Sequence, residues 1–249
     1  MRRHRLRLTA VSTFKSRVSE DDDIHATGPA LRTTRSYVRR EGRITEAQRR
    51  ALYELLPGRE WPVDAPSVAD VTGRHAPRSL EIGAGDGENI LALAARFPEE
   101  DFIACEVHGP GVGHLLMQAE HLGLRNLWIA RQDAHDLLAK LPAQALHCTY
   151  LFFPDPWPKK RHLKRRIFQA PLLDALTRAM SAHGRLLVAT DVADYAQWML
   201  DQAAAAPQWR NLAGEGKLSP RLKRRVLTKF ERRALRDGRS IHDFVFAPL

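Results

Sequence analysis

The chain has 249 residues, 44% of them hydrophobic, so it can bury a substantial core, and we expect one α/β domain with an added arm. No segment approaches the roughly 20 consecutive apolar residues that a membrane helix needs, so we expect no association with a membrane. Lys and Arg number 39 against 29 Asp and Glu, and the resulting formal charge of +10 favours a polyanionic partner.

The first 35 residues are polar and carry blocks of like charge, so we expect a flexible arm. The basic start, Met1–Arg7, is not followed by the long apolar segment of a signal peptide, so we expect the chain to stay in the cytoplasm. Cys105 and Cys148 lie in apolar runs. This favours small core residues in a reducing compartment over a disulfide or a metal pair.

Residues 36–77 are expected to hold one helix and a connector. The apolar spacing from Thr45 to Leu56 fits one face of a helix, which opens with a capping pattern at Thr45 and closes at Pro57-Gly58. A proline-containing connector, roughly Arg59 to Pro77, leads into the main domain at residues 78–249.

Apolar strand-like runs alternate with helical patterns in that domain. Helices are predicted over Asn89–Phe97 and near Val112–Leu122, and the predicted strands are Ser79–Ile82, Phe102–Val107, Leu127–Ala130, Leu146–Phe153 and Arg185–Ala189. The alternation indicates an α/β fold with a mostly parallel sheet and helices on both faces. Ligands bind such sheets beyond the carboxyl ends of the strands, so polar residues there are the candidates for function.

A glycine-rich turn, Gly83-Ala84-Gly85-Asp86-Gly87, follows the first predicted strand. Glycines let a backbone turn sharply and approach a ligand closely, so Gly83 and Gly85 are expected to bind a cofactor. Glu106, at the end of the next predicted strand, is placed to accept hydrogen bonds from the ribose hydroxyls of an adenosine. The arrangement predicts a Rossmann-like nucleotide site.

Two carboxylates favour one cofactor over another. The dinucleotide pattern G-x-G-x-x-G would need a glycine at position 88, where this chain has Glu88. Glu81 stands just before the turn, where a carboxylate suits the ammonium group of a methionine moiety better than an anionic pyrophosphate. The sequence therefore favours S-adenosyl-L-methionine over NAD.

The third and fourth predicted strands are each followed by another acid. Asp133 is placed either to bind the adenine amino group or to cap the helix that starts near Ala134, and the sequence favours neither role. Asp155 lies between two prolines in Phe153-Pro154-Asp155-Pro156-Trp157. Because prolines fix the loop, we expect Asp155 to point into the cleft beside the methyl donor.

A basic run, Lys159–Arg166, follows this loop and has six Lys or Arg among its eight residues. Its position beside the cleft favours contact with nucleic-acid phosphates. Trp157 either stacks on an extruded base or packs into the core, because an aromatic side chain suits both roles. Further cationic clusters lie between Arg32 and Arg43 and between Arg221 and Arg225.

Taken in order from about Arg35 to the C-terminus, these elements resemble the bacterial tRNA (guanine-N7-)-methyltransferase family. The matching motifs include Arg35–Arg40, the glycine turn, Glu106-Val107-His108, Phe152–Trp157, the basic run, Ala189-Thr190-Asp191 and Thr228–Glu231. The resemblance implies a Rossmann-like methyltransferase fold with a seven-stranded sheet. It also implies methyl transfer from S-adenosyl-L-methionine to N7 of guanine 46 in the variable loop of tRNA.

The resemblance implies roles for particular residues as well. Asp155 matches the proposed active-site aspartate and, with three other acids, lines the cofactor site: Glu81, Glu106 and Asp133. Six residues match substrate-binding positions: Lys159, Asp191, Thr228, Lys229, Phe230 and Glu231.

Two other interpretations remain open at this point. Asp155-Pro156-Trp157 is also related to the (Asp/Asn/Ser)-Pro-Pro-aromatic motif of enzymes that methylate exocyclic amines. A basic RNA-binding protein on a degenerate cofactor fold would carry the same cationic clusters without catalysing a reaction.

Overall fold

The computed structural model describes residues 35–37, 42–62 and 71–249. These residues belong to one compact unit, Thr34–Leu249. The expected arm lies outside the described residues except for Arg35, as do part of the connector and most of the Arg32–Arg43 cluster. Among the helices of the described residues, none is long and apolar enough to cross a membrane.

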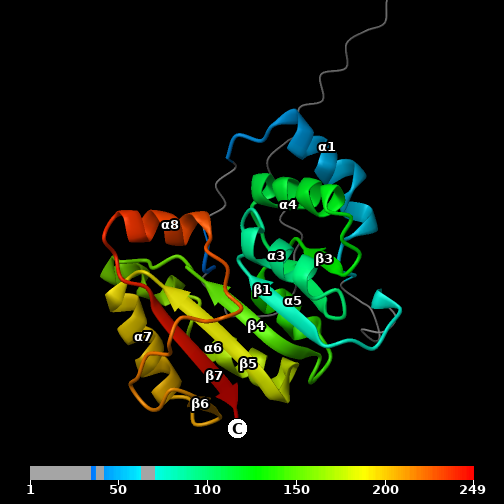
Figure 1. Ribbon diagram of the computed structural model, residues 1–249. Coiled ribbons are helices and arrows are strands. Elements are labelled where there is room, and N and C mark those ends of the chain that lie inside the picture. Colours follow the sequence, from blue (N-terminus) through cyan, green and yellow to red (C-terminus); the bar gives the residue numbers. More distant parts are fainter. Residues whose placement is uncertain (1–34, 38–41, 63–70) are drawn as a thin grey trace, which may run out of the picture. The chain divides into compact units, whose positions relative to one another are not determined.

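Seven strands form one sheet in the order β3-β2-β1-β4-β5-β7-β6 (Figure 1). Strands β1 to β5 pair in parallel, and β7 runs antiparallel to both β5 and β6. This confirms the expected mostly parallel, seven-stranded sheet. The strands are β1 (Arg78–Ile82), β2 (Asp101–Cys105), β3 (Leu127–Ala130), β4 (Leu146–Phe152), β5 (Met180–Thr190), β6 (Trp209–Asn211) and β7 (His242–Pro248).

Helices cover both faces of the sheet, as expected. One apolar cluster joins the sheet to α5, α6 and α7, and a second joins the opposite face to α1, α3 and α4. The helices are α1 (Glu46–Glu54), α3 (Glu88–Arg96), α4 (Gly109–His121), α5 (Ala134–Lys140), α6 (Ala170–Ala179), α7 (Ala193–Ala204) and α8 (Lys229–Arg236), with short 3₁₀ helices η1 (Leu56–Gly58) and η2 (Lys160–Arg165). Cys105 and Cys148 are buried in these clusters, which confirms them as core residues.

Several predicted boundaries shift, and two of these differences have a clear physical reason. Strand β2 ends at Cys105, because the carboxylate of Glu106 accepts hydrogen bonds from the next two backbone N–H groups and turns the chain out of the sheet. Strand β5 begins at Met180, well before the predicted Arg185. Its first part is polar and its pairing with β4 is irregular there, so no apolar alternation marks it.

The strand order reverses between β1 and β4, which places a crevice at their carboxyl ends. The chain returns from β6 through an isolated bridge between Ser219 and Asp243 of β7 and then packs against α3. Arg224 marks this contact: its guanidinium lies over the Phe97 ring, 4.3 Å from the centroid, and bonds to Glu100. The route brings α8 beyond the carboxyl end of β5 (Figure 1).

Helix α1 forms with the predicted cap and packs closely on α4. Thr45 and Gln48 make a reciprocal capping box at its start. Gly113 of α4 allows the approach, because a Cβ atom there would lie 2.8 Å from the backbone oxygen of Gln48.

Replacing Gly113 with alanine should therefore destabilise the protein. We expect the free energy of unfolding to fall by about 1–2 kcal/mol, because overpacking outweighs the better helix propensity of alanine. Urea unfolding followed by circular dichroism measures the change. Gly58→Ala is the matched control, since a Cβ atom at Gly58 meets nothing within 4 Å. An unchanged midpoint for Gly113→Ala would show that α1 does not depend on this close contact.

Candidate cofactor and acceptor site

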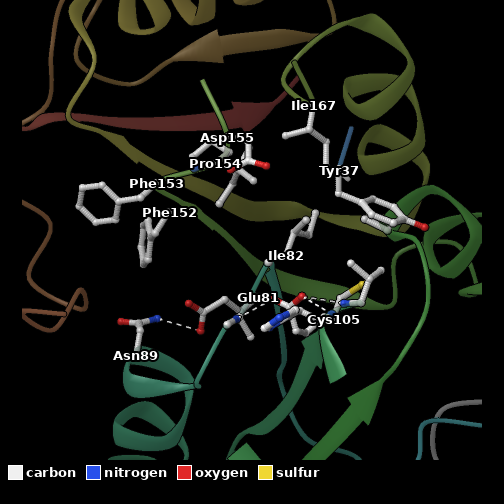
Figure 2. A pocket seen from close by; sticks show the side chains of 18 of the residues that line it. Tyr37, Glu81, Ile82, Asn89, Cys105, Phe152, Phe153, Pro154, Asp155 and Ile167 are labelled. Carbon is white, nitrogen blue, oxygen red and sulfur yellow. Dashed lines mark hydrogen bonds between the residues drawn. The ribbon is translucent and has the colours of Figure 1, made fainter. Parts of the chain in front are cut away.

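A cavity of about 640 Å³ opens at the carboxyl ends of β1 and β4 (Figure 2). The glycine turn and the acids that follow β1, β2 and β3 line it on one side. The Phe153–Asp155 turn after β4 and the start of α8 complete the wall. The switch point of the sheet thus brings residues from distant parts of the chain to one cleft.

Glu81 is a buried acid on the central strand, with 5% of its surface exposed. Burial raises the pKa of its carboxyl group to about 8, and the charge of Glu106 adds to the rise. Hydrogen bonds from the Asn89 side chain, at 3.2 Å, and from the backbone of Ile90 act in the opposite direction. Glu81 is therefore a carboxylate that a bound cation would help to ionise.

The glycine turn has the backbone that its composition predicts. Gly83, Gly85 and Gly87 all adopt positive φ angles, of 74°, 57° and 85°. The Gly85 N–H donates to Glu106 Oε2 at 2.8 Å, while Glu106 Oε1 accepts from the N–H groups of Val107 and His108. The carboxylate of Glu106 thus fixes the turn as well as facing the cavity.

The structure shows the capping role of Asp133 and also places this residue on the cavity wall. It is the N-cap of α5, where Oδ1 accepts from the His135 backbone N–H at 2.8 Å, and it also lines the cavity. Hydrogen bonding to the His135 side chain, together with the His135 backbone bond and charge, lowers the pKa of Asp133. A cap that faces a cavity can still offer its second carboxylate oxygen to a ligand.

The loop after β4 holds Asp155 between two strained residues. Phe153 and Trp157 have φ angles of 52° and 43°, in the left-handed region that bulky residues rarely adopt. The Arg166 guanidinium, buried to 1% exposure, donates to the Pro156 carbonyl at 2.9 Å and bonds to Asp194. Asp155 is itself exposed and lines the cavity, as Figure 2 shows beside Pro154.

The Trp157 ring packs against this chain. Its Nε1 donates to the Ser36 carbonyl at 2.9 Å, the Arg165 guanidinium lies 5.0 Å from the ring centroid, and His162 meets the ring edge-on. These contacts favour the packing role for Trp157 over base stacking. They also tie the N-terminal motif at Ser36 to the loop that carries Asp155.

The basic run divides into exposed and buried members. Lys159 precedes η2 and is exposed, as are Lys160, Arg161 and Lys164. Arg166, in contrast, lies between the rings of Tyr195 and Trp198 and supports the loop. The expectation of phosphate contact therefore does not extend to Arg166, because its guanidinium is buried.

The C-terminal motif is split between the cavity wall and the interior. Thr228, Lys229 and Phe230 line the cavity. Glu231 is 2% exposed and pairs with Arg225, which is also bonded to Asp243 at 3.0 Å through each of two nitrogens. Asp191 pairs with Arg239 just after α8.

Three further contacts hold α8 against the cofactor turn and the start of α3. The Lys229 ammonium pairs with Asp86, and the Glu88 carboxylate accepts from the Lys229 backbone N–H. Glu88 also pairs with Arg232 at 2.8 Å.

Asn89 is a site residue that our sequence analysis did not single out. It lies in the first turn of α3 with 2% exposure and joins Glu81 to the backbone N–H of Val226. A polar residue at the start of a helix whose next residues are apolar and buried was the available signal. Its partner at Val226 is 137 positions away, so local sequence carries no sign of that bond.

Comparisons with known proteins agree with this geometry. A family described as putative methyltransferases matches residues 75–244. The crystal structure of a variant 16S rRNA (adenine(1408)-N(1))-methyltransferase from Catenulisporales acidiphilia, with its cosubstrate SAM, has a similar fold. The TM-score is 0.54 at 14% identity, and the match covers 73% of this chain and 89% of that chain.

Sequence relatives are much more similar. The tRNA (guanine-N(7)-)-methyltransferase of Halorhodospira halophila is 49% identical over 221 residues, which cover 86% of this chain and 95% of that protein. The protein of the same name from Idiomarina loihiensis is 41% identical over 239 residues, with coverage of 95% and 96%. The resemblance seen in the motifs is therefore confirmed, and the chain belongs to the tRNA (guanine-N7-)-methyltransferase family.

Proposed function

We propose that this protein transfers a methyl group from S-adenosyl-L-methionine to N7 of guanine 46 in the variable loop of tRNA. The observation that carries the proposal is one cavity with an acidic cofactor end at Glu81 and Glu106 and a second end at Asp155 and Phe230. The acceptor follows from relatives named for N7 of guanine in tRNA. That shared name favours N7 over an exocyclic amine.

The residues present fit the cofactor. The buried Glu81 carboxylate suits an ammonium group, since a positive charge there would offset the cost of ionising it. Glu106 already accepts three backbone hydrogen bonds and has about four acceptor positions, which leaves one on Oε2 for a ribose hydroxyl. The volume lies within the roughly 300–1,000 Å³ of small-molecule sites.

N7 of guanine has an in-plane lone pair and no proton, so its attack needs no general base. The bound cofactor supplies an electrophilic methyl group. The protein then contributes position and electrostatics. The Asp155 carboxylate accepts hydrogen bonds from the N–H groups on the edge of the guanine and so orients the base. It also offsets the positive charge that develops on the purine.

The acceptor end combines contact residues with residues that hold them. Phe230 is 55% exposed on the cavity wall, so its ring is available to stack on the guanine. Thr228 and Lys229 contact the nucleotide beside it, while Glu231 and Asp191 act through their arginine partners. The exposed cations from Lys159 to Lys164 contact phosphates.

Replacing Asp155 with alanine tests its catalytic role. We expect kcat to fall about 10²–10³-fold, as when one stabiliser of transition-state charge is removed, with the tRNA dissociation constant within about threefold of wild type. Single-turnover methylation and filter binding provide the two measurements. Asp201→Ala, on the exposed surface of α7, is the control and should behave as wild type. Unchanged turnover in Asp155→Ala would remove Asp155 from the mechanism.

The raised pKa of Glu81 leads us to expect that a proton is released when the cofactor binds. With a pKa of about 8 the free carboxyl group is mostly protonated near pH 7, and an adjacent ammonium lowers that pKa, so most of one proton should leave. Near pH 9 the group is already ionised and the release should vanish. Titration calorimetry in buffers of different ionisation enthalpy counts the protons. Glu81→Gln should release none; equal release from both proteins would assign the proton to another group.

The methylated base identifies the reaction directly. We expect labelled S-adenosyl-L-methionine and unmodified tRNA to give a product that is cleaved at guanine 46 after borohydride and aniline treatment. N7-methylguanosine becomes cleavable by this treatment and an N-methylated exocyclic amine does not, so label without cleavage would indicate an exocyclic amine. Label at another guanine would refute only the position. Salt-sensitive tRNA binding without cofactor affinity would indicate a non-catalytic RNA-binding protein.

A further inference from the structure

The side chain of Asn89 lines the cavity and bonds both to Glu81 and to the chain segment that leads to α8. Its Nδ2 donates to Glu81 Oε2 at 3.2 Å, a bond drawn in Figure 2, and its Oδ1 accepts from the Val226 backbone N–H at 3.2 Å. A backbone N–H can only donate, so the amide oxygen must face Val226 and the NH₂ group must face Glu81. One half of this buried amide thus bonds to the acid at the cofactor end, and the other half bonds to the backbone that precedes Thr228.

Val226 begins the stretch of chain that leads to the acceptor residues. Arg225, directly before it, is anchored in the interior by two hydrogen bonds to Asp243 and by an ion pair with Glu231. Thr228, two residues after it, caps α8 and faces the cavity. The backbone N–H of Val226 therefore lies between a fixed anchor and the residues proposed to hold the nucleotide.

We propose that Asn89 is a positioning residue that couples cofactor binding to the acceptor segment, Val226–Phe230. A cationic group bound against Glu81 fixes the Asn89 amide, and Asn89 in turn fixes the backbone of Val226. The inference rests on the proposed function, which places the ammonium group at Glu81 and the guanine at Phe230.

The energetics of buried hydrogen bonds support this coupling. A hydrogen bond to an ionised acceptor is stronger than one to a neutral group, so ionisation of Glu81 beside a cation strengthens the bond that Asn89 donates. A buried amide that loses one partner is left with a polar group that neither protein nor water satisfies, so the conformation that keeps both bonds of Asn89 is favoured. Because coupling is reciprocal, tRNA bound at the acceptor end must raise the affinity for the cofactor by the same factor.

Glu88 provides a matched control on the same turn of α3. It also holds the acceptor segment, through Lys229 and Arg232, but from the surface, where its side chain is 36% exposed. Loss of that contact should weaken tRNA binding equally with and without cofactor. Loss of Asn89 should instead remove the difference between the two states.

The experiment measures hydrogen exchange in residues 222–231 and tRNA affinity, each with and without S-adenosylhomocysteine, which binds without turnover. In wild type we expect this ligand to slow exchange and to tighten tRNA binding at least about fivefold. 5′-Methylthioadenosine lacks the amino-acid group, so it should bind and change neither. This comparison uses the unaltered protein and does not depend on how any variant folds.

The near-isosteric Asn89→Asp keeps an acceptor for Val226 but has no N–H to donate to Glu81 once a bound ammonium group has ionised that acid. We expect its tRNA affinities with and without S-adenosylhomocysteine to agree within about twofold, with segment exchange that no longer responds, whereas Glu88→Gln should keep the wild-type ratio. A wild-type ratio in Asn89→Asp would overturn the inference. So would wild-type protein that binds the ligand with no change in the segment, and the proposed function would then stand. Wild-type protein that binds no cofactor would refute the proposed function itself.

Discussion

The carboxylate of Glu81 is buried at the end of the central strand, and the arrangement of the site depends on that burial. An acid in this position is costly to ionise unless hydrogen bonds or a cation compensate for lost water. The chain supplies part of this compensation from the start of α3, through Asn89 and the backbone of Ile90. The remainder is available to a ligand, so the same burial that costs stability creates affinity for a positive group.

The start of α3 can compensate Glu81 only because the glycine turn folds tightly. The turn passes under α4, where Gly111 approaches so closely that a Cβ atom would lie 2.8 Å from the Gly85 carbonyl oxygen. Glu106 fixes the other side through the Gly85 N–H. Two segments, α4 and the residue after β2, thus hold one turn, and that turn leads directly into α3 and Asn89. The geometry of the acceptor end is therefore determined partly at the cofactor end.

The features that the sequence predicted well are those with local causes. Strand β3, the capping box at Thr45 and the glycine turn depend on neighbouring residues, so the local sequence is enough to predict them. Strands β6 and β7 were not predicted, and they pair with each other, and β7 with β5, across long stretches of the chain. Helix α8 was missed although Thr228–Glu231 carries a local capping pattern like the one at Thr45. The same limit applies to the site: the acids at strand ends follow from topology, whereas the bond from Asn89 to Val226 exists only in the folded chain.

The net charge of a sequence does not say which of its cations are accessible to a partner. Arg166 and Arg225 count toward the net charge of +10, yet each is almost fully buried and pairs with carboxylates. Arg166 supports the loop of Asp155, and Arg225 supports the segment before Thr228. Each of the two chain segments proposed to hold the acceptor is thus fixed by one buried arginine. Counterion release on RNA binding comes from phosphates neutralised by accessible cations, so neither arginine contributes to it. In the proposed complex with tRNA, we therefore expect the exposed lysines and arginines around η2 and α8 to set the salt dependence, and a count over the whole sequence overstates their number.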